Sequence, residues 1–281
     1  MSVFKYRVNK LRFLIILKKQ LVFQTFYYSI FKNDILVSII NENRKFLRTI
    51  DKFLNEDIYK NNDYGIQRRI YEKLESEISE LPTYSDFLIL IISLHFKNKI
   101  NYLEIGVSVL KNFLQINNGV FNSNLIAYDI NKINPNFKNL DSISKNGNSL
   151  RYFEGSVLDR IDALEFNSKF NYKYDLIFSD ALHEPDAIRK EYELLIKDNL
   201  KEEFLIYYDD LDFQGVEKEL INIHYDLEKH LNKKLNLYTL KIYGWIGQHE
   251  KLHKNGIITS IDFENFLKKN NLKFYGFKKI K

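Results

Sequence analysis

The segment from residue 100 to residue 130 constrains the fold of this chain more than any other. A short apolar run, Tyr102 to Ile105, ends at Gly106, an amphipathic segment follows, and a second apolar run ends at Asp129. This order predicts a strand, a tight turn, a helix and a second strand. Ligands of open parallel sheets bind at the carboxyl ends of the strands. Gly106 would let the backbone approach such a ligand closely, and Asp129 can accept the two hydroxyls of a ribose.

The glycine spacing argues against a dinucleotide cofactor. A pyrophosphate site uses G-x-G-x-x-G, because bare N–H groups must face two phosphates. Only Gly106 is present here, and Ser108 and Leu110 stand where further glycines would be expected. S-adenosylmethionine (SAM) carries no phosphate and needs fewer glycines. The segment 103–108 resembles motif I of class I SAM-dependent methyltransferases, which implies that Glu104, Gly106 and Ser108 contact the cofactor.

Length and composition bound the class of protein. The chain has 281 residues, 45% of them hydrophobic and 15% aromatic, which suffices for one large domain or two small ones. It has no cysteine, which excludes disulfides and thiolate metal sites and fits a reducing compartment. The net charge of +5 comes from lysines spread along the chain, so we expect no nucleic-acid partner. The apolar run 13–17 is too short for a signal peptide or a membrane span, so we predict a cytoplasmic protein.

The chain divides near residue 98. Residues 1–97 predict a helical N-terminal extension, with helical spacing of apolar residues over Gln67–Leu81 and an apolar helix over Tyr84–Phe96. Residues 4–31 could touch a membrane surface or a partner, but we favour a helix packed on the core or on a second subunit. A homo-oligomer formed through these helices is the corresponding hypothesis.

Residues 98–281 predict an α/β domain. Strand candidates alternate with helices, notably helices over 185–198 and 214–231, which is typical of a parallel sheet covered on both faces. We therefore predict a Rossmann-like, seven-stranded, mostly parallel sheet. The strand candidates are 100–105, 124–129, 150–154, 174–179, 203–208 and 235–243, with a further one near 257–259.

Acidic side chains follow two of these strands. Asp180 ends the strand at 174–179, and Asp209 and Asp210 end the strand at 203–208. Three carboxylates at neighbouring strand ends raise one another's pKa, and a hard cation such as Mg²⁺ would relieve the repulsion. A metal-bound hydroxyl loses its proton more easily and becomes a nucleophile. The alternative is that Asp209 and Asp210 cap the next helix, for which one acid would be enough.

The wider pattern of residues 98–260 resembles a more specific group. Residues 175–183, 191–195 and 209–216 resemble the methyltransferase family that includes small-molecule and sugar O-methyltransferases. The resemblance implies that Asp180, Asp209 and Asp210 bind Mg²⁺ and that Ser156 contacts the adenine. His183 would face the same cleft, where it either accepts the proton of a substrate hydroxyl or caps the helix at 185–198.

A competing motif lies near the C-terminus. Residues 249–253 match H-E-x-x-H, the zinc-peptidase pattern, which requires a helix so that both histidines share a face. The glycines on either side predict instead a connection between strands, from Gly244 to Gly256. Such a loop would hang over the active-site edge, so Trp245, His249 and His253 are predicted to contact the substrate. Trp245 could equally be a core anchor.

Taken together, these patterns predict a SAM-dependent O-methyltransferase. Its substrate would be a hydroxyl of a small molecule or sugar, and Mg²⁺ would assist the transfer. Asp180 and His183 would be the catalytic residues. Two alternatives stay open: a non-catalytic binding protein on a decayed methyltransferase fold, supported mainly by Leu110, and the zinc peptidase.

Overall fold

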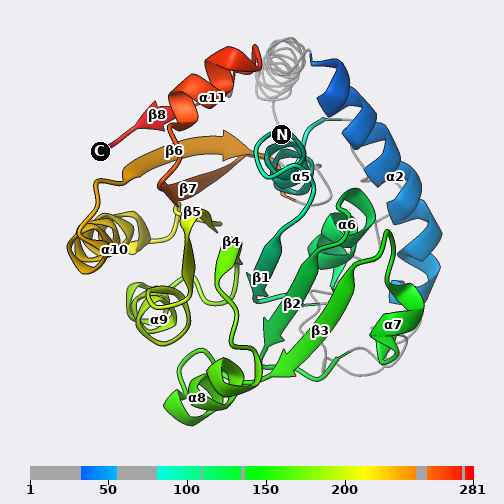
Figure 1. Cartoon of the computed structure of the whole chain (residues 1–281), viewed down its shortest axis with the longest axis horizontal. Coiled ribbons are helices and arrows are strands. Elements are labelled where there is room, and N and C mark those ends of the chain that lie inside the picture. Colours follow the sequence, from blue (N-terminus) through cyan, green and yellow to red (C-terminus); the bar gives the residue numbers. More distant parts are fainter. Residues whose placement is uncertain (1–32, 56–80, 109, 134–136, 245–251, 274–275) are drawn as a thin grey trace, which may run out of the picture.

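The computed structural model of this chain describes residues 33–55, 81–108, 110–133, 137–244, 252–273 and 276–281. Its centre is one eight-stranded sheet (Figure 1). The strands are β1 (Asn101–Ile105), β2 (Asn124–Asp129), β3 (Ser149–Glu154), β4 (Tyr174–Ser179), β5 (Leu200–Tyr208), β6 (Asn236–Ile242), β7 (His253–Thr259) and β8 (Lys278–Lys279). In space they follow the order β3-β2-β1-β4-β5-β7-β6-β8. The strands from β1 to β5 pair in parallel, whereas β7 runs antiparallel to both β5 and β6.

Helices cover both faces of this sheet (Figure 1). On one face lie α8 (Arg160–Lys169), α9 (Pro185–Glu191) and α10 (Val216–Leu231); on the other lie α2 (Asp34–Asn55), α5 (Tyr84–Leu94), α6 (Lys111–Gly119), α7 (Leu140–Ile143) and α11 (Phe263–Lys269). Side chains of the central strands alternate between two cores, as strand geometry requires. In β4, Leu176 and Phe178 belong to the core under α5 and α6, and Ile177 belongs to the core under α8 to α10.

The predicted strands are confirmed with small shifts in their bounds, but the predicted number of seven is wrong. The eighth strand is a two-residue pair, Lys278–Lys279, which hydrogen-bonds to the edge of β6. Two lysines carry no apolar alternation, so no sequence pattern indicates a strand there. Charged residues at a sheet edge oppose pairing with other chains.

The helices also match in part. The helix predicted over 185–198 is α-helical to Glu191 and continues as a π-helical turn over Tyr192–Ile196. The helix predicted over 84–96 ends at Leu94, and it begins with a capping box between Thr83 and Asp86. The helix predicted over 67–81 lies outside the described residues except for its last residue, Leu81, and the segment 4–31 lies wholly outside them.

The described part of the N-terminal extension shares its core with the sheet. Leu36, Ile40 and Phe46 of α2 belong to the same apolar cluster as Tyr102 of β1. Nothing in the described residues separates the two regions as independent cores, although the boundary predicted near residue 98 stays a prediction.

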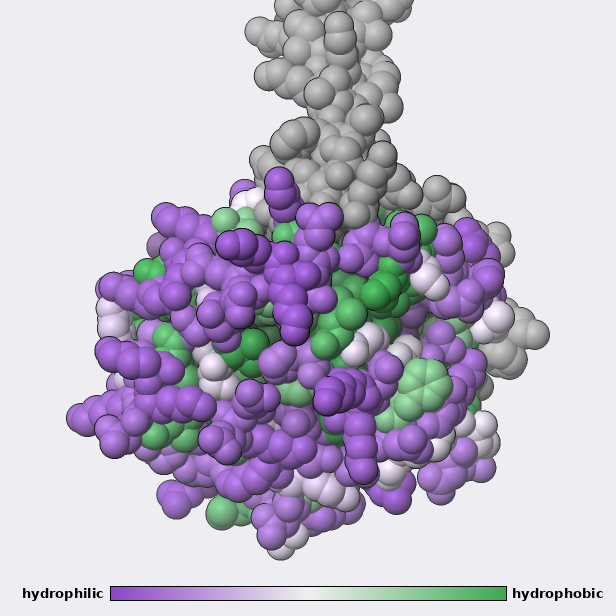
Figure 2. Space-filling view, turned by 45° about the horizontal axis from the view of Figure 1, so that its top comes forward, coloured by the Kyte–Doolittle hydropathy of each residue, from purple (hydrophilic) through white to green (hydrophobic). Residues whose placement is uncertain are grey.

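The outer surface is mainly hydrophilic on the side shown in Figure 2, with hydrophobic patches between the charged side chains. Within the described ranges, no helix combines the length and the apolar character that crossing a membrane requires.

The topology determines where a site can form. β1 lies at the centre, and the chain leaves it toward β2 on one side and later returns as β4 on the other. Such a reversal opens a crevice at the carboxyl ends of the two central strands. The ends of β1, β2, β4 and β5 carry the acidic residues predicted to be functional.

Candidate active site

The turn after β1 is built around Gly106. Its φ of +84° lies in the left-handed region, and its N–H donates to the carbonyl oxygen of Tyr128 at 2.8 Å. A Cβ atom at this position would lie 2.3 Å from the backbone oxygen of Asp180 and 2.5 Å from Ala181. Only glycine fits, because the segment after β4 passes directly against the turn.

Leu110 keeps the backbone shape expected of the glycine that it replaces. Its φ is +68°, its side chain is buried, and its N–H donates to the carbonyl oxygen of Val107 at 2.7 Å. A non-glycine residue in this region costs on the order of 1–3 kcal/mol, which the surrounding structure must compensate. The absence of the second motif I glycine therefore does not abolish the turn.

Asp129, at the end of β2, ties this turn to the sheet. Its Oδ2 accepts hydrogen bonds from the backbone N–H groups of Val107 and Ser108, both at 2.8 Å. Its Oδ1 accepts from the backbone and side chain of Asn131, at 2.8 and 2.9 Å. A ribose hydroxyl would have to compete with these donors for the oxygens of Asp129. The side-chain amide of Asn131 is the one donor of the four that does not belong to the backbone.

Glu104 lies in β1, two residues before Gly106, on the face of the sheet that α5 and α6 cover. It is 1% exposed, and its Oε2 accepts from the Tyr102 hydroxyl at 2.6 Å and from Nδ2 of Asn112 at 2.8 Å. Burial raises the pKa of Glu104 well above its usual value, the hydrogen bond from Tyr102 opposes this, and the charge of Asp180 adds to it. Motif I alone did not indicate Asn112 or Tyr102, since neither belongs to its pattern.

Ser156 follows β3 at the same edge. Its backbone N–H donates to Asp162 at 2.7 Å, and its carbonyl oxygen accepts from the Tyr128 hydroxyl at 2.9 Å. The side chain is partly exposed. These contacts fix the backbone at the predicted adenine edge.

The predicted metal ligands meet two histidines at the ends of β4, β5 and β7. His183 Nε2 lies 3.2 Å from an oxygen of Asp180, and His253 Nδ1 lies 2.6 Å from an oxygen of Asp210. The same His253 nitrogen is 3.8 Å from Asp209, and His183 Nδ1 is 3.9 Å from Asp210. Five ionisable side chains therefore form one cluster, in which Asp209 is the most buried, with its side chain 5% exposed.

The electrostatics of this cluster follow from burial and like charges. Burial raises the pKa of Asp209 well above its usual value, and the charges of Asp180 and Asp210 raise it further. Burial alone would lower the pKa of His253, but the contact with Asp210 and the other carboxylates outweigh it and raise that pKa to about 9. The carboxylates thus favour the protonated form of the histidines that they contact.

His253 is not where the sequence predicted it. The connection between β6 and β7 was expected to reach Gly256, but β7 already begins at His253 and pairs Gly256 with both Tyr208 and Thr239. His253 therefore lies against Asp209 and Asp210 rather than in a loop. Because it opens a strand, it cannot share a helix face with His249, as the zinc-peptidase motif requires. Trp245 and His249 lie outside the described residues.

The residues present fit a divalent cation. Asp209, Asp210 and His253 can each offer one ligand atom, and these atoms lie within 4.8 Å of one another. Carboxylate oxygens suit Mg²⁺ and Mn²⁺, and an imidazole nitrogen favours transition metals such as Mn²⁺ over Mg²⁺. Asp180 faces the same cluster through His183.

An aromatic ring borders the cluster on its open side. Phe213 stacks on His183 with ring centroids 5.1 Å apart, and it is 52% exposed. Leu182 beside it is 43% exposed. Apolar side chains are thus exposed next to the charged cluster.

Neither a protein-family profile nor a curated protein sequence matches this chain. Solved structures do match its fold. One is an O-methyltransferase from Bacillus cereus in complex with SAH, with 13% identity over 75% of this chain and 96% of that chain, and a TM-score of 0.45. Another is the O-methyltransferase TomG from Streptomyces achromogenes in complex with SAM, with 12% identity over 67% and 89% and a TM-score of 0.41.

A third match is the MycE methyltransferase of the mycinamycin biosynthetic pathway, in complex with Mg, SAH and mycinamycin VI. It is 11% identical over 61% of this chain and 48% of that chain, with a TM-score of 0.40. These structural neighbours are SAM-dependent methyltransferases, the class that the sequence motifs resemble. At such identities and TM-scores the likeness concerns the fold, and the residues of the site must carry any functional argument.

Proposed function

We propose that this chain is a SAM-dependent O-methyltransferase that acts on a hydroxyl of a small molecule or sugar with the help of a divalent cation. One observation carries the proposal: the aspartate and histidine cluster of β4, β5 and β7 lies beside the glycine turn of β1, at the point where the strand order reverses. This edge therefore offers a cofactor half and an acidic half next to each other.

The cofactor half would bind SAM through residues already in place. Glu104 would take the ammonium group, Asp129 the ribose hydroxyls and Ser156 the adenine edge. Gly106 and Ser108 would line the turn against which the cofactor lies. SAM supplies an electrophilic methyl group on its sulfonium.

The acidic half would bind the acceptor. Asp180, Asp209 and Asp210, joined by His253, would hold the cation, which would lower the pKa of an acceptor hydroxyl. His183, held by Asp180, would take the proton from that hydroxyl. Both halves would align the acceptor oxygen with the methyl group, and alignment of two reactants supplies a large part of the acceleration in such transfers.

The binding-protein alternative loses its main support. It rested on the missing glycine at Leu110, whose backbone keeps the left-handed turn. The zinc-peptidase alternative is weakened by the strand that begins at His253.

Calorimetric titration with SAM and SAH, with and without Mg²⁺ or Mn²⁺, tests the proposal. We expect SAM to bind, and radiolabelled methyl transfer to a panel of phenols, vicinal diols and sugars to depend on the cation. Binding of NAD but not of SAM would refute the class of enzyme. Methyl transfer that persists fully in EDTA would refute the role of the cation alone.

The contribution of His253 can be measured without activity. Mn²⁺ bound to the protein gives a paramagnetic resonance signal that differs from that of free Mn²⁺, so its affinity can be titrated directly. We expect His253→Leu to weaken Mn²⁺ binding by about tenfold, while His230→Leu, a control in the exposed part of α10, leaves it unchanged.

A further inference from the structure

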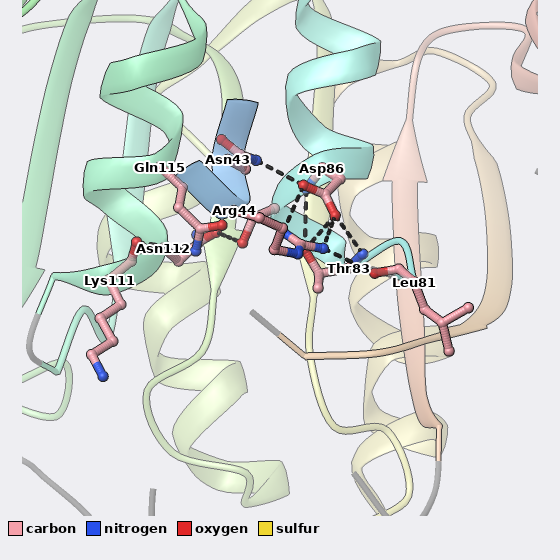
Figure 3. Close-up of polar contacts among 9 residues, drawn as sticks. Asn43, Arg44, Leu81, Thr83, Asp86, Lys111, Asn112 and Gln115 are labelled. Carbon is pink, nitrogen blue, oxygen red and sulfur yellow. Dashed lines mark hydrogen bonds and ion pairs between the residues drawn. The ribbon is translucent and has the colours of Figure 1, made fainter. Parts of the chain in front are cut away.

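A buried chain of polar side chains links helix α2 to the first turn of α5 (Figure 3). Arg44 of α2 forms an ion pair with Asp86 at 2.6 Å, and the two side chains are 4% and 0% exposed. Asn43 Nδ2 donates to the same carboxylate at 2.8 Å, and so does the backbone N–H of Thr83. The guanidinium also donates to the carbonyl oxygen of Leu81 at 2.9 Å. Charge-assisted bonds of this kind are strong, so they fix α5 rigidly on α2.

The chain continues from α5 to α6. Ser85, the neighbour of Asp86, donates its hydroxyl to the amide oxygen of Asn112 at 2.7 Å. This contact sets the orientation of the amide, because it leaves the amide nitrogen to face the other way. That nitrogen donates to Glu104 at 2.8 Å. The amide oxygen of Asn112 is therefore bound to α5, and its amide nitrogen is bound to Glu104, the acid of motif I.

The position of Glu104 depends on these contacts. Both of its hydrogen bonds, from Asn112 and Tyr102, end on Oε2, and no bond to Oε1 is present among the described residues. The carboxylates of Asp180 and Asp129 face Glu104 from the ends of β4 and β2 and, like burial, raise its pKa. The two donors oppose this effect, since they stabilise the charged form.

We propose that Asn112 is a positioning residue of the cofactor site and that helix α2 belongs to this site through Arg44, Asp86 and Ser85. The inference rests on the proposed function, in which Glu104 binds the ammonium group of SAM. Asn112 stabilises the charged form of the carboxylate and leaves Oε1 for the ammonium. Helix α2 fixes the position of α5, and α5 in turn fixes the orientation of the Asn112 amide.

A matched pair of variants on one helix tests the inference. Asn112 and Asn117 both lie on α6 and are 4% and 1% exposed, but Asn117 bonds to Ile143 and Asn148 rather than to Glu104. We expect Asn112→Ala to raise the Kd for SAM by about tenfold, because a hydrogen bond to a charged group is lost. Asn117→Ala should change this Kd by less than about twofold, even if both variants lower Tm.

The pH profile of SAM affinity supplies a readout that a merely structural role would not move. Without the donor of Asn112 the pKa of Glu104 rises, so the pH below which affinity is lost moves upward. In Asn117→Ala this pH should stay where it is in the wild type. Ser85→Ala, which keeps Asn112 but removes the contact that orients its amide, should shift the profile in the same direction by a smaller amount, and it serves if Asn112→Ala does not fold.

The part played by α2 is measured by a double-variant cycle. Arg44 contacts Asp86 and Asn112 contacts Glu104, but in the proposed chain both affect SAM through the position of Glu104. The effects of Arg44→Lys and Asn112→Ala on SAM affinity should therefore be less than additive. Additive effects would separate α2 from the site. Equal effects of Asn112→Ala and Asn117→Ala, or an unmoved pH profile, would overturn the role of Asn112 while leaving SAM binding established. A wild-type protein that binds no SAM would overturn this inference together with the proposed function.

Discussion

The two halves of the carboxyl edge stabilise their acidic groups in different ways. In the cofactor half, Glu104 and Asp129 accept hydrogen bonds from neutral donors of their own turn, strand and helix. In the acidic half, Asp180, Asp209 and Asp210 lie against one another and against two histidines. Neutral hydrogen-bond donors thus stabilise the carboxylates of the first half, whereas those of the second half depend on contact with ionisable histidines or a cation.

This difference indicates what each half needs from a ligand. Neutral donors orient a carboxylate and leave its charge for a cationic group, such as the ammonium of SAM. A cluster of aspartates in contact with two histidines instead offers oxygen and nitrogen ligands, and binding of a divalent cation to such ligands releases protons. Variants that act on one half and not on the other can therefore separate cofactor binding from acceptor chemistry.

The largest effect is expected at Gly106, where the turn of the cofactor half touches the backbone of the acidic half. Gly106→Ala would place a methyl group 2.3 Å from the backbone oxygen of Asp180, at a φ of +84°. We expect a loss of about 2–5 kcal/mol in the free energy of unfolding, measured by chemical denaturation. Gly276→Ala is the control, because its φ is +63° but its nearest contact is a flexible side chain, Lys241, at 3.2 Å. Equal losses in both variants would show that strain at positive φ, not the contact with the backbone of Asp180, is responsible.

The next largest effect concerns the acidic half. Asp209→Asn keeps the shape of the side chain but removes one charge from the cluster, so we expect methyl transfer to fall by at least about 100-fold. The Kd for SAM should stay within about twofold, since the cofactor half is untouched. Asp212→Asn is the control, because Asp212 lies on the same loop and accepts from the Lys254 backbone instead. A large loss of SAM affinity in Asp209→Asn would contradict the division into halves.

A smaller effect is expected at the end of β2. Asp129→Ala removes the acceptor of the Val107 and Ser108 N–H groups together with the predicted ribose contact, so the Kd for SAM should rise at least tenfold, or roughly 1.5 kcal/mol. The affinity for Mn²⁺ should not change. Unchanged SAM affinity in calorimetry would remove Asp129 from the cofactor site.

A separate effect, on stability alone and not on binding, is expected at Glu191, behind the acidic half. Burial raises its pKa from 4.5 to about 8, and a hydrogen bond with Ser179 opposes this only in part. Since the folded pKa is the higher one, the stabilising effect of the proton is fully present below pH 4.5 and is lost as the pH rises through 8. We expect Glu191→Gln to be more stable than the wild type by about 4 kcal/mol at pH 8, at roughly 1.4 kcal/mol per unit of pKa difference, and equally stable at pH 4. Parallel Tm curves between these two pH values would contradict the prediction.

Much of the fold could be predicted because the central strands are buried on both faces. Runs such as 125–128 and 176–178 are apolar without interruption, which indicates buried parallel strands. The beginning of β7 could not be predicted in this way. Residues 253–256 read His-Lys-Asn-Gly, and only backbone pairing with β5 and β6 makes them a strand.

The position of a candidate residue was predictable where an acid follows an apolar strand, as at Asp129, Asp180 and Asp209, and the structure brings these three to one edge of the sheet. It was not predictable where a residue acts through its partner. Asn112 and Ser85 lie 27 positions apart, and nothing in their local sequence shows that they meet. Glu191 was noted only as part of a resemblance, and its burial beside Ser179 follows from the packing of α9 on the sheet.

The early start of β7 bears on how the neighbouring segment could be engineered. Four paired positions fix β7 against β5, and seven, His253 among them, fix it against β6. Exchange of residues 245–251, which include Trp245 and His249, would then leave the paired positions of β7 in place. If this segment contacts the acceptor as proposed, acceptor preference and cation binding would be separable, and grafting a different 245–251 segment would change the first without the second.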